Sequence, residues 1–153
     1  MKDTFYQDPV FNGAADPAVI YNEAEECWWM FYTNRRVGVP EDGVAWVHGT
    51  DIGIAASKDG ESWDYVGIAE GLHYEEGRNT YWAPEVIRYM NQYHMYVSYV
   101  PGIPKDWNAV RYILHYTSED LLHWNFESRI ELSSDRCIDA CVHLLPDGDW
   151  GMW

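Results

Sequence analysis

The chain has 153 residues, which is enough for one domain with a modest hydrophobic core. Its formal net charge is −15, from 25 acidic and 10 basic side chains. This balance argues against partners that are bound through phosphate groups, because affinity for nucleic acids and for anionic membranes depends on clustered Lys and Arg. We therefore expect neither a nucleic-acid partner nor a membrane partner.

Residues 1–15 form a polar, turn-rich lead-in. A first group of four short strands is then predicted at 16–21, 27–32, 51–56 and 63–68. These segments are rich in apolar, β-branched and aromatic residues, and turn-forming residues separate them. A long loop, 34–50, joins the second predicted strand to the third.

The pattern then starts again. A second group of strands is predicted at 85–89, 93–99, 112–116 and 124–126, with a loop at 101–109, and a third group begins at 139. No segment keeps a helical period over three turns. The sequence therefore predicts an all-β fold.

A motif repeats at matching places in the two groups. Ser57-x-Asp59-x-x-x-Trp63 corresponds to Ser118-x-Asp120-x-x-x-Trp124, and both copies follow an apolar strand. A period of roughly 60 residues with four short strands per unit is typical of β-propeller blades. We predict a single partial β-propeller domain over 1–153, with about two and a half blades: blade one about 16–69, blade two about 85–131, and the start of blade three at 139–153.

Three acidic residues, Asp16, Glu85 and Asp139, each open an apolar predicted strand. The first strand of a propeller blade lines the central channel. Counting direction changes along each blade then puts the three carboxylates at one rim of that channel. The predicted long loops and the linkers between blades share this face: 34–50, 70–82, 101–109 and 132–138.

Carboxylates around one pocket suit the cleavage of glycosidic bonds, which needs one group to protonate the leaving oxygen and another to activate water or attack carbon. A neighbouring carboxylate can raise the pKa of the acid by repulsion between like charges. Aromatic rings can stack on sugars, and Arg or His can bind sugar hydroxyls, although such loop residues can equally be solvated. The substrate-binding candidates on this face are Tyr81, Trp82, Trp46, Arg35, Arg36 and His48.

The chain resembles the five-bladed propeller glycosidases of glycoside hydrolase family 43. The matching segments are Asp16-Pro17 after Asn12-Gly13-Ala14-Ala15, Trp82-Ala83-Pro84-Glu85, and Ile138-Asp139-Ala140. The resemblance implies inverting hydrolysis of an oligosaccharide or glycoside, with Asp16 as general base and Glu85 as the residue that tunes the pKa of the acid. It implies that Asp139, followed by Ala140 where the family has proline, lines the site.

The general acid of that family is a Glu from a later blade, which this sequence does not contain. We therefore expect either a homo-oligomer or further C-terminal blades to complete the propeller. Two alternatives stay open: a carbohydrate-binding protein without turnover, and an assembly module that pairs through exposed strand edges.

The remaining features are less informative. The three cysteines, Cys27, Cys137 and Cys141, offer no workable close pair, which indicates free thiols in a reducing compartment. The segment Met1–Phe5 lacks the apolar core of a signal peptide, so we expect a cytoplasmic protein, or a secreted one if a signal was removed. No metal-ligand spacing is visible, and we expect no metal and no cofactor.

Overall fold

The computed structural model describes residues 5–153, so residues 1–4 of the predicted domain lie outside the described residues. The described chain is all-β, as predicted. It forms ten strands in three antiparallel sheets, and its one helical element is the short 3-10 turn η1 (Ala45–Val47).

The first two sheets have the same topology, in which four consecutive strands pair in chain order. The first contains β1 (Ala15–Asn22), β2 (Cys27–Thr33), β3 (Ile52–Ser57) and β4 (Asp64–Ile68). The second contains β5 (Thr80–Tyr89), β6 (Gln92–Val100), β7 (Tyr112–Ser118) and β8 (Asn125–Ile130). A two-stranded sheet of β9 (Val142–Leu144) and β10 (Trp150–Met152) follows.

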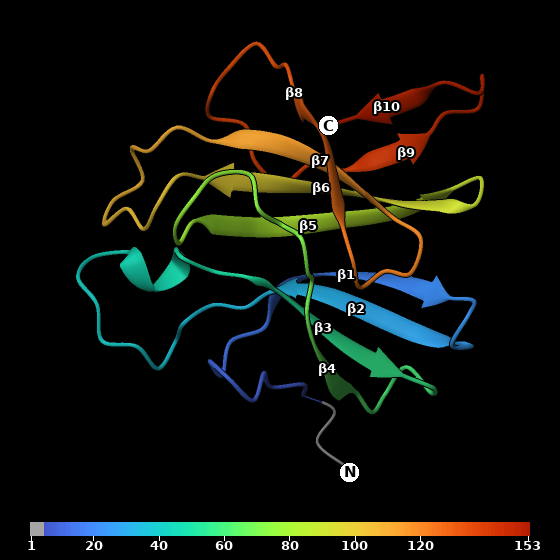
Figure 1. The fold of residues 1–153 in the computed structure, drawn as a ribbon, viewed down its shortest axis with the longest axis horizontal. Helices are drawn as coiled ribbons and strands as arrows, with labels where there is room; N and C mark the ends of the chain where they lie inside the picture. The colour runs from blue at the N-terminus through green and yellow to red at the C-terminus, as the bar shows by residue number, and fades with distance from the viewer. Residues whose placement is uncertain (1–4) are drawn as a thin grey trace.

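The sheets are stacked in chain order, with β1–β4 at the bottom of Figure 1 and β9–β10 at the top. The main hydrophobic core lies between the first and second sheets. Phe31 on β2 meets Trp124 edge to face, with ring centroids 5.8 Å apart, and both side chains are buried. This stacking of four-stranded antiparallel meanders is the arrangement of propeller blades.

The repeated Ser-x-Asp motif forms the same turn in both sheets. The Oδ1 atom of Asp59 accepts hydrogen bonds from the amides of Glu61 and Ser62, at 2.8 and 2.7 Å. The corresponding atom of Asp120 accepts from the amides of Leu122 and His123, at 2.9 and 2.8 Å. The repeat that was visible in the sequence is therefore a repeat of local structure.

Two strand starts near the predicted carboxylates differ from the prediction, and the first is that of β9, which begins at Val142 and not at Asp139. The strand expected to start at Glu85 is β5, and it starts at Thr80. Tyr81 and Trp82 therefore belong to a strand and not to a linker, and Glu85 lies roughly 15 Å along the strand from its beginning. A β-bulge between Tyr81 and Pro84 interrupts the regular pairing with β6, and this irregularity hid the first half of the strand from the sequence pattern.

Candidate functional site

The long loops of the first two sheets meet at one end of the structure, on the left in Figure 1. The amide of Val44 donates to the carbonyl of Lys105 at 3.1 Å, which joins loop 34–51 to loop 101–111. The hydroxyl of Thr80 accepts from the amide of Gly49 at 2.7 Å and donates to the carbonyl of Gly102 at 2.8 Å. These contacts fix the loop face around the beginning of β5.

A cavity of about 160 Å³ opens on this face. It contains two of the three predicted carboxylates, Asp16 and Asp139, which come from β1 and from the segment before β9. The other lining residues are Arg35, Val47, Trp82, Trp107 and Ile138. The cavity is smaller than the roughly 300 Å³ at the low end of sites for drug-sized ligands, so it can enclose only one small ring.

Asp16 lies at an irregular position of β1. The pairing of β1 with β2 shifts register between Ala15 and Ala18, and Asp16 has a positive φ of 53°. Its Oδ2 atom accepts a hydrogen bond from Nη2 of Arg35 at 3.1 Å, and both side chains are partly exposed. The irregularity sets the direction of the carboxylate, and Arg35 holds it there.

Asp139 has a matching backbone conformation, with φ at 58°. Its amide donates to the hydroxyl of Ser98 on β6 at 3.0 Å, which ties the segment to the second sheet. Burial raises the pKa of the Asp139 carboxyl above its ordinary value, and the negative charge of Asp16 raises it further. The amide of Ala83 and the charge of Arg35 act in the opposite direction on this pKa. The charge of Asp16 is therefore felt at Asp139.

Glu85 does not line this cavity. It is partly buried, and its Oε1 atom accepts a hydrogen bond from the amide of Val142 at 3.1 Å. This contact joins β5 to the first residue of β9, three residues after Asp139. Glu85 thus links two blades close to the cavity.

An aromatic group forms one side of the cavity. His48 is buried, and its ring centroid lies 5.8 Å from that of Trp82 and 5.6 Å from that of Trp107. Its Nδ1 atom is 3.1 Å from the carbonyl of Val44, and burial lowers the pKa of the imidazole. His48 therefore supports the two tryptophans from behind and does not reach the cavity.

The other predicted binding residues lie elsewhere. Tyr81 is buried in the core between the sheets. Arg36 is buried and paired with both carboxylate oxygens of Glu41, at 2.5 and 2.9 Å, so it organises loop 34–51. Trp46 on η1 is absent from the cavity lining. Of the predicted binding residues, the cavity brings together Asp139, Trp82 and Arg35 with Asp16.

Sequence reasoning missed Val47, Trp107 and Ile138 as cavity residues. A signal existed for Trp107, because it is the one aromatic residue in the loop 101–109 that had been assigned to this face. Its side chain is 53% exposed, whereas that of Trp82 is buried, so Trp107 offers the accessible ring. Ile138 stands directly before Asp139 in a segment that carried the family resemblance, whereas Val47 is an ordinary apolar residue that nothing in the sequence distinguishes.

Within residues 5–153, no group of three or more His, Cys, Asp or Glu side chains is arranged to hold a metal ion. In the same part of the chain, no helix has the length and apolar character that a membrane span requires.

The stacked four-stranded antiparallel sheets define the class of fold as part of a β-propeller. Three solved structures show the same fold. A family 43 β-xylosidase/α-arabinofuranosidase from a compost microbial metagenome matches with a TM-score of 0.66 and 19% identity, over 91% of this chain and 41% of its own. The arabinanase Arb43A of Bacillus subtilis matches with a TM-score of 0.63 and 18% identity, over 92% and 48%. Zg3597, a family 117 glycoside hydrolase from Zobellia galactanivorans, matches with a TM-score of 0.66 and 18% identity, over 93% of this chain and 48% of its own.

The chain thus spans less than half the length of these three structures. The resemblance to family 43 and related propeller glycosidases that the sequence predicted is confirmed at the level of the fold. Comparisons with protein-family profiles and with curated sequences find no match.

Proposed function

We propose that this chain supplies part of the active site of a glycoside hydrolase-like propeller protein, which cleaves an oligosaccharide or glycoside by inverting hydrolysis. The observation that carries the proposal is the pair Asp16 and Asp139 on one small cavity beside the exposed ring of Trp107. Paired carboxylates beside an aromatic surface suit glycosidic cleavage. The solved structures with the same fold are named as glycoside hydrolases.

In this proposal Asp16 is the general base. Its carboxylate is partly exposed and is held by Arg35 at 3.1 Å, so it can accept a proton from a water molecule in the cavity. That water then attacks the anomeric carbon from the side opposite the leaving oxygen.

The resemblance assigned the pKa-tuning role to Glu85, and the geometry favours Asp139 for it. Asp139 lines the same cavity as Asp16, and its pKa is raised by burial and by the neighbouring charge. The carboxylate of Glu85 is bound to the amide of Val142, outside the cavity. We therefore assign Glu85 as a positioning residue, which holds β9 against β5 and thereby places Asp139.

A proton donor for the leaving oxygen is also needed. The cavity contains no carboxyl group among the described residues besides those of Asp16 and Asp139. We propose that the acid comes from outside this chain segment, either from a second copy or from further blades of a longer protein.

A panel of aryl glycosides tests the proposal in wild-type protein and in the Asp16→Asn variant. The expected result is release of the aryl group by the wild type and loss of release in the variant, with substrate binding retained. Turnover by Asp16→Asn at the wild-type rate would refute the role of Asp16.

A carbohydrate-binding protein without turnover is the second candidate function. The cavity favours this function, because its described lining residues include no third carboxyl group that could protonate the leaving oxygen. Calorimetric titration with the same glycosides separates the two candidates, because binding without any release supports this one. The third reading, an assembly module, predicts association of the protein with neither binding nor release.

A further inference from the structure

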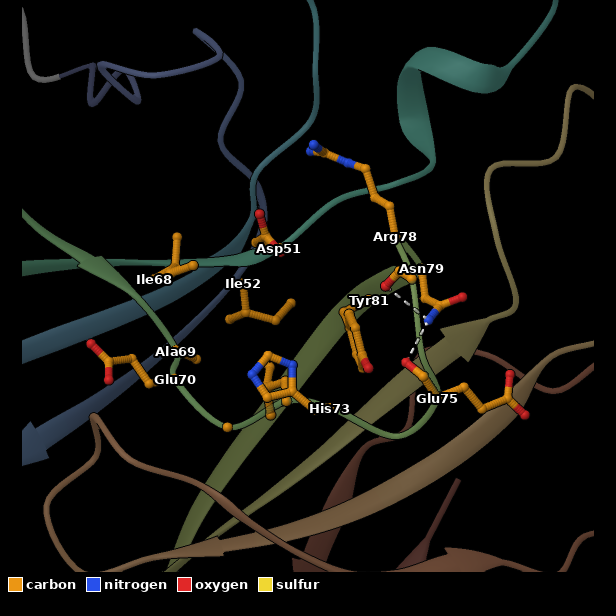
Figure 2. A pocket seen from close by; sticks show the side chains of 13 residues that line it. Asp51, Ile52, Ile68, Ala69, Glu70, His73, Glu75, Arg78, Asn79 and Tyr81 are labelled. Atoms are coloured by element: carbon orange, nitrogen blue, oxygen red, sulfur yellow. Dashed lines mark hydrogen bonds between the residues drawn. The ribbon is translucent and has the colours of Figure 1, made fainter.

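A second and larger cavity of about 470 Å³ lies where the first sheet passes into the second. The end of β4, the beginning of β3 and the linker from Ala69 to Asn79 enclose it, as Figure 2 shows. Its polar lining residues are Asp51, Glu70, His73, Glu75, Arg78 and Asn79. This cavity shares no lining residue with the Asp16 cavity.

Asp51 is the distinctive residue of this second cavity. Its side chain is partly buried, and no described residue donates a hydrogen bond to its carboxylate. Burial raises its pKa, and the charges of Arg78 and His73 act against that increase. Its oxygen atoms are open to the cavity, so they can accept hydrogen bonds from an incoming group without breaking a contact within the described residues.

The other walls of the cavity are fixed before any ligand arrives. The carboxylate of Glu75 accepts a hydrogen bond from the hydroxyl of Tyr99 at 2.8 Å. Nε of Arg78 donates to the carbonyl of Gly49 at 2.8 Å. The amide of Trp124 donates to the carbonyl of Glu70, also at 2.8 Å, which joins the linker to the second sheet. The linker is therefore anchored to the sheets at several points.

His73 and Arg78 supply donors around Asp51. The imidazole of His73 is exposed, and Figure 2 shows it in the cavity, on the opposite side from Asp51 and Arg78. The apolar part of the lining consists of Ile52, Ile68, Ala69, Leu72 and Tyr81. A carboxylate acceptor, nitrogen donors and an apolar wall are thus brought together in one cavity.

This combination selects among ligand classes. Three carboxylates, from Asp51, Glu70 and Glu75, disfavour an anion, and Arg78 and the surrounding lining disfavour a metal ion. A neutral ring with adjacent hydroxyl groups fits both the acceptor and the donors of the cavity. Its hydroxyls can donate to Asp51 and accept from His73 and Arg78, while its C–H face covers the apolar wall. We propose that this cavity is a second binding site for a neutral sugar unit, separate from the Asp16 cavity. The choice of a sugar among neutral polyols rests on the proposed function.

The two cavities are connected through β5. Tyr81 lines the second cavity and Trp82, the next residue, lines the first. Both cavities lie beside the loops that Thr80 anchors. A glycan bound in the second cavity would therefore lie on the same side of the propeller as the proposed catalytic carboxylates.

Nuclear magnetic resonance titration of the full ¹⁵N-labelled chain with xylotriose and with arabinotriose tests the proposal. We expect saturable shifts of backbone amides in residues 69–79 with at least one of the two probes. Asp51→Asn should raise the dissociation constant at these amides about tenfold, because one charged acceptor is lost. Glu76→Gln, an exposed change in the same linker outside the cavity lining, is the matched control and should leave the constant unchanged.

The outcomes separate this proposal from the proposed function. Shifts confined to the surroundings of Asp16 and Asp139 would support the catalytic cavity and overturn the second site. Shifts confined to residues 69–79 would support the second site and count against sugar binding in the catalytic cavity. A titration carried to high-millimolar probe that shifts no amide in residues 69–79 overturns the second site, whether or not the amides around the Asp16 cavity shift. His73→Ala, at an exposed position, replaces Asp51→Asn if that variant does not fold, and it too should weaken binding.

Discussion

Asp16 and Asp139 both have φ values in the left-handed region, at 53° and 58°. Non-glycine residues in this region are uncommon, although Asp is among those that tolerate it best. Here the conformation directs two carboxylates from different blades toward one cavity. The sequence identified both residues as acids at the start of strands, but it could not show their backbone conformation.

The raised pKa of Asp139 makes a prediction about stability. Because its pKa is higher in the folded protein than the ordinary value of 3.8, the folded state retains the proton more readily, and stability falls as the pH rises from 3.8 through the raised pKa. Asp139→Asn removes this contribution. The difference in free energy of unfolding between variant and wild type, measured by urea titration across this range, should therefore increase with pH in favour of the variant.

The control for that experiment is Asp147→Asn, because Asp147 is an exposed acid in the turn between β9 and β10. A difference in free energy of unfolding between wild type and Asp139→Asn that stays constant with pH would contradict the raised pKa of Asp139.

At the scale of elements, the Ser-x-Asp turns are small structural units that can be tested alone. Burial acts to raise the pKa of Asp120, but the hydrogen bonds from His123 and Leu122 lower it to about 2. The stabilisation is therefore present above the ordinary pKa of 3.8 and is lost as the pH falls toward 2.

We expect Asp120→Ala to lower the free energy of unfolding by about 1 kcal/mol at neutral pH, the size of a lost capping hydrogen bond. Asp120→Asn keeps an oxygen acceptor and should cost less. Thermal denaturation at pH 7 and near pH 2 measures both variants, and the gap between wild type and Asp120→Ala should narrow at the lower pH. An equal difference in stability between wild type and Asp120→Ala at the two pH values would contradict the role of the ionised Asp120 carboxylate in the turn.

Gly53 on β3 offers a second test at this scale. A Cβ atom there would lie 2.3 Å from the ring of Tyr32, which is fully buried. Gly53→Ala should therefore destabilise the first sheet by about 1–3 kcal/mol through overpacking. Gly67→Ala on β4, where a Cβ atom meets nothing within 4 Å, is the matched control and should change stability little. Urea denaturation of both variants measures the difference.

Strand order, the blade repeat and the loop face were predictable because they follow from alternating apolar residues and from a repeated turn motif. The beginning of β5 was not, since the bulge between Tyr81 and Pro84 breaks the alternation on which strand prediction rests. Glu85 was consequently placed at the rim with Asp16 and Asp139, whereas Trp82 takes the position on β5 that faces the cavity. The contacts of Arg36 and His48 depend on how loop 34–51 folds back, which a local pattern does not encode.

At the scale of the whole molecule, the outer sheets carry exposed apolar side chains. On the first sheet these include Val19, Tyr21 and Trp28, and on the third they include Leu144 and Trp150. β10 is also the edge strand of a two-stranded sheet. Exposed apolar residues beside an open strand edge favour association.

We therefore predict that this chain associates with further copies in solution. Light scattering after size exclusion should give a mass above the 17.9 kDa of one chain. Trp150→Ser should shift the mass toward that value, whereas Trp46→Ser, an exposed tryptophan in the loop before β3, serves as the control. A wild-type mass of one chain would remove a second copy as the source of the missing acid.

The most direct test of the proposed site is the rate at which wild-type protein and the Asp16→Asn variant release the aryl group from a panel of neutral aryl glycosides. We expect measurable release by the wild type and a loss of at least about a hundredfold in the variant, which is the low end for removing a general base. Equal rates in the two proteins would contradict the assignment of Asp16. No release on any substrate by a wild-type protein that includes the source of the acid, a second copy or the further blades, would contradict hydrolysis and leave the carbohydrate-binding function as the better description.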